Sequence, residues 1–265
     1  MIAIIGLGRI GSRIAKQLKN KSLMLIDRDI VEKEGLNNFY LNKHIGMPKA
    51  IAAKNVLKTK KTFQIKAFSL DLTARNIRIL KECRTVVDCT DNMEIRFLLG
   101  EYCKKNNKIL IHTAASNNKG VVALFKGKPC FNCIYQGKKS LESCYGREID
   151  ERIVKKIEMI VIKILNNPKN FYNTLFRITE NKIYRIKMTP NIKCRVCSGE
   201  YFFLKRERRI KIEKLCGKGV FQVKGRPIKE DFKIINDKIT IFRDGRALVK
   251  AKSISEAKKV YNANR

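Results

Sequence analysis

The chain has 265 residues, of which 58 are Lys or Arg and 24 are Asp or Glu, so its formal net charge is +34. Hydrophobic residues make up 44% of the sequence, which is enough for a packed core and excludes an intrinsically disordered chain. Neither a signal-like N-terminal segment nor an uncharged apolar run of about 18 residues occurs, so we expect a cytoplasmic protein that does not enter a membrane.

The first 112 residues predict an alternation of strands and helices. Short apolar runs, such as residues 2–5, are typical of buried parallel strands, and segments with apolar residues at helical spacing separate them. In chain order we expect a strand at 2–5, a helix at 12–20, a strand at 23–26, a helix at 49–58, an extended segment at 63–70, a helix at 74–82, a strand at 85–89, a helix at 93–106 and a strand at 109–112. This order predicts an α/β fold, a Rossmann-like, doubly wound and mainly parallel sheet with helices on both faces.

From Gly120 onward the pattern changes. A strand over 121–125 is expected as an antiparallel continuation of the sheet, and apolar residues at helical spacing predict a long helix over 149–165. The apolar stripe of that helix needs a partner, which is either this core or a second subunit.

Residues 201–265 predict a small, basic α+β module that follows a first domain over residues 1–200. Strands are expected at 210–212, 220–223, 238–242 and 247–249. Asp244-Gly245 between two apolar runs is typical of a hairpin turn. Ser253 and Glu256 fit a capping box at the start of a final helix.

A glycine-rich motif follows the first predicted strand. Gly6, Gly8 and Gly11 form G-x-G-x-x-G at the opening of a helix, and Asp27 ends the next strand. The glycines permit a tight turn and a close backbone approach to phosphate, and the carboxylate can bind a ribose hydroxyl. The motif predicts nucleotide binding without separating NAD from ATP, and a glycine turn that only packs the helix on the sheet is the alternative.

Further polar residues after the predicted strands favour ATP. They are Asp29, Lys49, Asp91, Asn92 and Arg96. Lys49 at a helix start can contact a phosphate, and Asp91 at the carboxyl end of a central strand can hold Mg²⁺. A dehydrogenase does not need this pair. An enzyme that directs attack on the α-phosphate of ATP does, because a metal and a cation neutralise the charge that moves onto pyrophosphate.

Four of the nine cysteines form two Cys-x-x-Cys pairs, Cys130 with Cys133 and Cys194 with Cys197. A two-residue spacer lets both thiolates of a pair reach one ion, and two such pairs complete a tetrahedral Cys₄ shell without an open position. The pattern predicts a structural Zn²⁺ that joins distant segments of the chain. Free buried thiols or a redox pair are the alternatives.

The sequence resembles the ThiF/MoeB/HesA family of ubiquitin-activating-enzyme-like adenylyltransferases. The resemblance covers about residues 1–200, and parts of the tail resemble an extension that some members carry. It rests on both Cys pairs and on the motifs GLGRIGS at 6–12, D-x-D-x-V-E at 27–32, GMPK at 46–49, DCTDN at 88–92 and HTAASNNKGVVALF at 112–125.

The resemblance implies an ATP-dependent enzyme that forms a homodimer. In the family, the acid matching Asp27 binds the ATP ribose, the lysine matching Lys49 contacts phosphate, and the aspartate matching Asp91 serves Mg²⁺ and adenylation. The implied partner is a ubiquitin-like sulfur-carrier protein of the ThiS/MoaD type, whose C-terminal Gly-Gly carboxylate attacks the α-phosphate of ATP. Sulfur transfer onto the acyl-adenylate would then feed thiamine, molybdopterin or tRNA thiolation.

Two departures from the family pattern concern the ATP site. Asn38 stands where the family carries an ATP-binding arginine, and the chain begins at its first strand without the N-terminal arm that supplies a second arginine. The lost guanidinium groups would each have formed charge-assisted hydrogen bonds worth about 1.5–3 kcal/mol. We expect Arg9, in the glycine loop itself, to compensate and to act with Asp91 and Lys49.

Cys144 matches the place where relatives carry a cysteine able to form a thioester, persulfide or acyl-disulfide link to their carrier. The motif around it differs from the usual one, so an incidental loop thiol is the alternative, with an external sulfurtransferase delivering the sulfur. Cys83, Cys89 and Cys103 fall in apolar contexts and are expected in the core. Both histidines are expected to be structural, so we assign no histidine base.

Two functions of other classes stay open. A non-catalytic carrier-binding protein would keep the fold and the zinc without ATP chemistry. An ATP-dependent enzyme of the same superfamily that acts on tRNA would use the positive charge. Because lysines are scattered through almost every segment, compositional drift and a working basic surface both account for that charge. A simple NAD dehydrogenase is the least favoured function.

Overall fold

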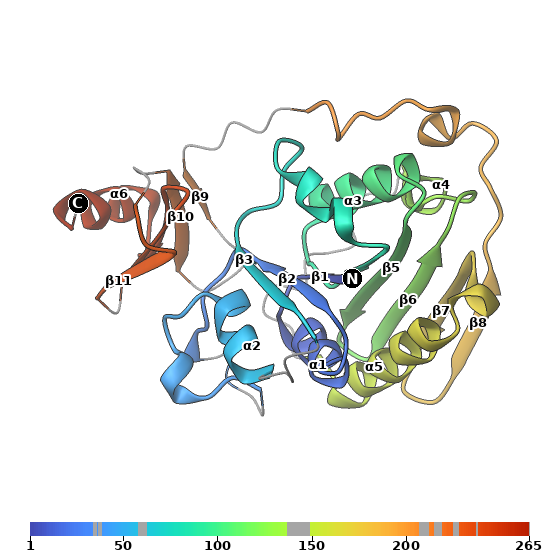
Figure 1. Cartoon of the computed structure of the whole chain (residues 1–265), viewed down its shortest axis with the longest axis horizontal. Coiled ribbons are helices and arrows are strands. Elements are labelled where there is room, and N and C mark those ends of the chain that lie inside the picture. Colours follow the sequence, from blue (N-terminus) through green and yellow to red (C-terminus); the bar gives the residue numbers. More distant parts are fainter. Residues whose placement is uncertain are drawn as a thin grey trace.

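The computed structural model describes residues 1–33, 36, 39–57, 63–136, 149–206, 212–214, 219–224, 228–236 and 238–264. Their main feature is a large sheet with the strand order β3-β2-β1-β4-β5-β6-β7-β8 (Figure 1). The strands are β1 (Ile2–Ile5), β2 (Leu23–Asp27), β3 (Ile65–Ser69), β4 (Thr85–Asp88), β5 (Ile109–Ser116), β6 (Lys119–Phe125), β7 (Thr174–Ile178) and β8 (Ile183–Lys187). The pairs from β3 to β5 are parallel and those from β5 to β8 are antiparallel, which confirms the predicted mixed α/β fold.

The strand order reverses between β1 and β4. From β1 the chain moves outward to β2 and β3, and it then returns to the other side of β1 to form β4. The connections after β1 and β4 therefore leave the sheet in opposite directions. In open α/β sheets this arrangement opens a crevice at the carboxyl ends of the strands, which is where ligands bind.

Helices cover both faces of the sheet. One face carries α1 (Arg9–Gln17), α2 (Lys49–Leu57) and α5 (Glu151–Asn166), and the other carries the 3₁₀ helix η3 (Ile77–Glu82), α3 (Met93–Lys105) and α4 (Phe131–Tyr135). Successive strand residues point to opposite faces, so Ile4 packs in the first core while Ala3 and Ile5 pack in the second. Shorter 3₁₀ helices are η2 (Asn42–His44), η4 (Pro168–Phe171) and η5 (Arg195–Ser198).

Helix α5 buries its apolar stripe within its own chain. It packs against α1 and β6, and the stripe is buried at Ile153, Val154, Ile157, Ile160, Val161 and Ile164. Of the two partners expected for this stripe, the structure thus contains the intramolecular one. The stripe is not available as the contact of a homodimer.

The C-terminal part forms a second, antiparallel sheet with the order β11-β12-β13-β10-β9. Its elements are β9 (Ile212–Lys214), β10 (Val220–Lys224), β11 (Phe232–Asn236), β12 (Ile239–Phe242), β13 (Arg246–Lys250) and α6 (Ile254–Ala263). The predicted turn at Asp244-Gly245 joins β12 to β13, and Gly245 adopts φ +82°, where glycine is favoured. Ser253 Oγ caps α6 by accepting from the Glu256 amide, while the Glu256 carboxylate accepts from the Lys252 amide.

The sequence patterns missed three strands and misassigned one helix. Strands β7, β8 and β11 had no predicted counterpart. For β8 and β11 the reason is that β8 and most of β11 are exposed and lack a period of two in hydrophobicity. The helix expected at 74–82 is the 3₁₀ helix η3, in which Ile77 and Leu80 are buried at the three-residue spacing of such a helix.

The segment after the second Cys pair packs on α3, one of the helices that cover the large sheet. The backbone amides of Phe202 and Leu204 both donate to the buried carboxylate of Glu101 on α3, and Phe203 stacks on Phe97 at 5.1 Å. The division of the chain into 1–200 and 201–265 stays a prediction. Among the described residues, none of the helices is long and apolar enough to cross a membrane.

Candidate functional site

A pocket of about 370 Å³ lies at the carboxyl ends of the central strands, where the strand order reverses. It brings together residues that come from four different strand ends and from the start of α2. The predicted nucleotide-site residues in its lining are Gly6, Gly8, Arg9, Asp27, Asp29, Lys49, Asp91, Asn92 and Arg96. Gly11 does not line the pocket.

The three glycines of the loop meet different steric demands. Gly6 has φ +85°, and a Cβ there would lie 2.8 Å from the carbonyl oxygen of Cys89. A Cβ on Gly11 would lie 1.9 Å from the carbonyl oxygen of Gly6. A Cβ on Gly8 would meet no atom within 4 Å among the described residues. Gly6 and Gly11 therefore allow the strand, loop and α1 to pack, whereas Gly8 leaves open space at the pocket.

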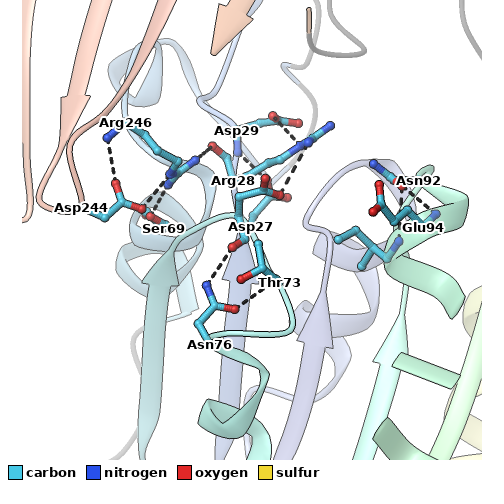
Figure 2. A network of polar contacts seen from close by, with 12 residues as sticks. Asp27, Arg28, Asp29, Ser69, Thr73, Asn76, Asn92, Glu94, Asp244 and Arg246 are labelled. Carbon is cyan, nitrogen blue, oxygen red and sulfur yellow. Dashed lines mark hydrogen bonds and ion pairs between the residues drawn. The ribbon is translucent and has the colours of Figure 1, made fainter. Parts of the chain in front are cut away.

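Asp27 holds the glycine loop at the end of β2. One carboxylate oxygen accepts from the Leu7 amide. The other accepts from the Asp29 amide at 2.8 Å, and Figure 2 labels both aspartates. Burial raises the pKa of Asp27 above its ordinary value, although the ammonium of Lys49 opposes this effect. Each carboxylate oxygen retains a lone pair, so the side chain can still accept from a ligand hydroxyl.

Lys49 is the first residue of α2 and is surrounded by acids. Its Nζ lies 3.5 Å from Oδ2 of Asp29, and its amide donates to the Asp29 carbonyl at 2.9 Å. Burial lowers the pKa of Lys49, but the carboxylates of Asp29, Asp27, Glu32 and Asp91 outweigh this and raise it. The lysine is therefore charged at neutral pH and sits among carboxylates at one end of the pocket.

The loop after β4 carries Asp91 at the exposed rim of the pocket. Asn92 caps α3, because its Oδ1 accepts from the amides of Glu94 at 2.8 Å and of Ile95 at 3.3 Å (Figure 2). Arg96 is buried and its guanidinium donates to the Thr90 carbonyl. Both residues line the pocket, yet their side chains also hold the protein itself. Arg96 binds the loop that carries Asp91, and Asn92 joins that loop to the first turn of α3.

A buried pair lies under that same loop. Nδ1 of His112 lies 2.7 Å from Oδ2 of Asp88, and the other oxygen of Asp88 accepts from the amide and hydroxyl of Thr90. His112 is fully buried beside the rings of Phe131 and Tyr135, in agreement with the structural role expected for it. The pair itself was not predicted, because the two residues belong to different strands.

Arg9, the first residue of α1, also lines the pocket. Its guanidinium is 3.8 Å from the Glu151 carboxylate at the start of α5, and both side chains are about half exposed. Arg13, one turn later on α1, forms ion pairs with Glu151 and with Glu158. The expected phosphate-loop arginine is thus present at the pocket, held by a weak, exposed ion pair.

Two further charged residues of the lining were missed by sequence reasoning. Arg28 follows β2, Asp71 follows β3, and Nη1 of Arg28 lies 3.6 Å from Oδ1 of Asp71. Their position at the ends of neighbouring strands would have been a usable signal, since parallel strands end at the same edge of a sheet.

The four predicted zinc ligands come together. The sulfur atoms of Cys130 and Cys194 are 3.6 Å apart, those of Cys133 and Cys197 are 3.5 Å apart, and all four lie within 4.8 Å of one another. Tetrahedral bonds of about 2.3 Å from Zn²⁺ to sulfur separate the ligands by about 3.8 Å. The cluster therefore fits a structural zinc ion that joins α4 to η5.

Three cysteines expected in the core are described by the structure. Cys83 and Cys103 are buried, and Cys89 is half-buried at the pocket wall. Burial raises the pKa of the Cys89 thiol to about 12, so it is not a thiolate at neutral pH. Cys144 and Asn38, on which two further predictions depend, lie outside the described residues.

The glycine loop, the acids at the strand ends and the Cys cluster all lie in the part of the chain that one family model matches. Residues 1–224 match the model of the ThiF family. The chain belongs to the ThiF family. This confirms the resemblance on which the sequence interpretation rested.

This ThiF family member is similar to curated proteins that include the following two. "Adenylyltransferase and sulfurtransferase MOCS3" of Danio rerio is 29% identical over 143 residues, which are 51% of this chain and 31% of that protein. "Sulfur carrier protein ThiS adenylyltransferase" of Bacillus subtilis (strain 168) is 24% identical over 304 aligned positions, covering 98% of this chain and 90% of that protein. The chain therefore spans about a third of the length of the MOCS3 relatives.

Solved structures agree with the fold of this family. The structure described as E. coli MccB with ATP aligns with a TM-score of 0.62 and 20% identity, over 74% of this chain and 65% of that one. PaaA aligns with a TM-score of 0.58 and 16% identity, over 70% and 63% of the two chains. At these identities the likeness concerns the fold.

Proposed function

We propose that the protein is an ATP-dependent adenylyltransferase that activates the C-terminal carboxylate of a ubiquitin-like sulfur-carrier protein ending in Gly-Gly. Family membership supports nucleotidyl transfer, and the names of the MOCS3 and ThiS adenylyltransferase relatives support a sulfur carrier as the substrate. The destination of the sulfur is thiamine, molybdopterin or tRNA thiolation.

The observation that carries the proposal is the placement of one half-buried lysine and several carboxylates beside an open glycine loop. Gly8 leaves the space that a phosphate needs, and Lys49 brings a positive charge to the same pocket. Oδ1 of Asp29 is buried and accepts no hydrogen bond within the described part of the chain, and Nε of Arg28 lies 3.9 Å from it, so this oxygen can accept from a ribose hydroxyl. Asp27 offers further acceptor capacity beside it.

The proposed reaction needs alignment and charge stabilisation rather than a protein base. The carboxylate of the carrier is already a nucleophile, and its attack on the α-phosphate releases pyrophosphate. Lys49 and Arg9 would stabilise the charge on the phosphates. Asp91, exposed at the rim among the carboxylates, would hold Mg²⁺, which supplies further neutralisation of the leaving pyrophosphate.

Two details of the pocket bear on the expected departures from the family pattern. Asn38 contributes no guanidinium, so Arg9 is the residue proposed to replace the lost charge. Its present partner, Glu151, is about half exposed, and such ion pairs contribute little. Arg9 can therefore exchange this carboxylate for a phosphate at small cost. Arg96 and Asn92 would act by holding the loop of Asp91.

The test is ATP–pyrophosphate exchange with the purified protein, measured with and without a carrier ending in Gly-Gly from the same cell. Carrier-dependent exchange is expected, and Asp91→Asn should lower it about 100-fold or more. The matched control is Asp231→Asn, which removes the charge of an exposed aspartate directly before β11 and should leave exchange unchanged. If the protein binds the carrier but shows no exchange, it is instead a non-catalytic binding protein. If it shows no exchange and does not bind the carrier, tRNA is the next candidate substrate.

A further inference from the structure

The C-terminal module contacts the large sheet through a buried arginine. Arg246, the first residue of β13, is only 7% exposed. Its Nε donates to Oδ2 of Asp244 at 2.8 Å, Nη1 donates to the Arg28 carbonyl at 3.1 Å, and Nη2 donates to the Ser69 carbonyl (Figure 2). The guanidinium also lies 4.4 Å from the centre of the Phe242 ring. Every nitrogen of this buried cation therefore has a partner.

The two carbonyls bound by Arg246 end neighbouring strands of the large sheet. Arg28 directly follows β2, Ser69 is the last residue of β3, and Asp27 pairs with Ser69 in the register of the two strands. A planar guanidinium presents its donors in a fixed fork, so binding two carbonyls at once fixes their separation. Arg246 thus ties together the ends of β2 and β3 from outside the pocket.

The same strand ends form a wall of the pocket. Arg28 and Asp71 line it, and their 3.6 Å ion pair joins the two strand ends on the pocket side. The Asp71 carbonyl accepts from Nδ2 of Asn76 at 2.9 Å, which fixes the turn after β3 (Figure 2). Asp29, with its open acceptor oxygen, is adjacent to Arg28. A shift of either strand end would therefore move groups that face a ligand.

Other contacts hold the module against this wall. Ile30, two residues after Arg28, packs with the buried side chains of Phe242 and Leu248. The hydroxyl of Thr240 donates to the Gly46 carbonyl at 3.2 Å, three residues before Lys49. The module lies beside β3 and α2 in Figure 1, at the edge of the sheet opposite β8. Its contacts thus reach segments that lead directly into the pocket.

We propose that the C-terminal module positions the nucleotide pocket, and that Arg246 is the positioning residue. The module then determines nucleotide affinity without contacting the nucleotide. This inference rests on the proposed function for its nucleotide part, but the ordering of the strand ends can be measured without any ligand.

The test compares Arg246→Gln with the matched control Arg243→Gln in the full-length chain. Arg243 also donates from Nε and Nη2 to a carbonyl, that of Lys229, but its contacts stay inside the module. Asp244→Asn is a milder second variant, since it weakens the support of the Arg246 guanidinium and keeps the guanidinium itself. Hydrogen exchange of residues 26–31 and 68–73, thermal unfolding and titration with ATP are measured for each.

Arg246→Gln should accelerate exchange in both peptides and weaken ATP binding about tenfold, because the pocket wall loses its outer support. Asp244→Asn should act in the same direction with a smaller effect, and Arg243→Gln should match the wild type. The proposal is overturned if Arg246→Gln and Arg243→Gln exchange alike in these peptides. If the wild type binds no ATP, the proposed function fails, while the exchange comparison still decides whether Arg246 positions the wall.

Discussion

Nδ1 of His112 donates to a carboxylate oxygen of Asp88 across 2.7 Å, and both side chains are completely buried under the loop that carries Asp91. Burial lowers the pKa of His112, so its ring is neutral at physiological pH. The hydrogen bond from His112, the hydrogen bonds from Thr90 and the charge of Arg96 outweigh burial and lower the pKa of Asp88. The neutral ring and the carboxylate together form a fixed support for the pocket loop.

This pair predicts that acid destabilises the protein. His112 and Asp88 both have lowered pKa values in the folded state, so the unfolded chain binds their protons first as the pH falls. For His112 the contribution to stability is fully present above the ordinary histidine pKa of 6.5 and is lost as the pH falls below it. Urea unfolding from about pH 7.5 to about pH 5.5 should show falling stability, and His112→Asn should flatten this dependence.

The companion variant for that experiment is His44→Asn. Burial and Lys43 also lower the pKa of His44, so this variant should flatten the curve in the same sense. The two substitutions together should remove the histidine part of the dependence, since the chain has only 2 histidines. An unchanged slope in the double variant would contradict the argument.

Substitutions of two glycines should separate folding from ligand binding. Gly11→Ala places a Cβ 1.9 Å from the Gly6 carbonyl and should cost about 3 kcal/mol or more of stability. The Cβ of Gly8→Ala meets no atom within 4 Å in the described part of the chain, and the variant should change stability by less than about 0.5 kcal/mol. ATP titration should nevertheless show weaker binding for Gly8→Ala, because the methyl group occupies space at the glycine loop. Equal unfolding curves for the two variants would refute this.

Replacing Lys49 should lower the stability of the protein, because the carboxylates around it then repel one another without a compensating charge. Lys49→Met removes the ammonium group that counteracts the effect of burial on the Asp27 carboxylate. The variant should destabilise the protein by about 2–3 kcal/mol at neutral pH. The loss should shrink toward about pH 4.5, because burial raises the pKa of Asp27 and protonation of this carboxyl group relieves its repulsion with its neighbours. Lys54→Met, on the exposed side of the same helix, is the control and should change little. A loss that does not vary with pH would argue against an electrostatic role.

The Cys cluster predicts one zinc ion per chain. Metal analysis of the purified protein should find it, and Cys197→Ser should lose it together with thermal stability, because the metal joins α4 to η5. Cys83→Ser disturbs a buried core position instead and should retain the zinc while it lowers stability. Zinc bound by Cys197→Ser with unchanged affinity would show that the fourth ligand is another group.

Local patterns in the sequence were sufficient to predict much of the site. The glycine loop, the acids after the strands and the paired cysteines depend on spacing along one short segment, and parallel strands place their ends at one edge of a sheet. The apolar stripe of α5 was equally visible in the sequence. The spacing of its apolar residues predicts which face of the helix is buried, but it does not predict the surface on which that face packs. The structure supplied the partner, which is the chain's own core.

Other features depend on contacts that no local pattern contains. Arg246 meets carbonyls 218 and 177 positions away in the chain, and His112 meets Asp88 from a neighbouring strand. Asn92 and Arg96 were visible as polar residues near the site, yet only the fold shows that Asn92 caps α3 and that Arg96 binds the loop of Asp91. The sequence by itself determined which chemical groups the site residues carry and at which strand ends they lie. The tertiary structure decided which of those groups face the pocket and which support it, because that depends on packing between elements distant in the chain.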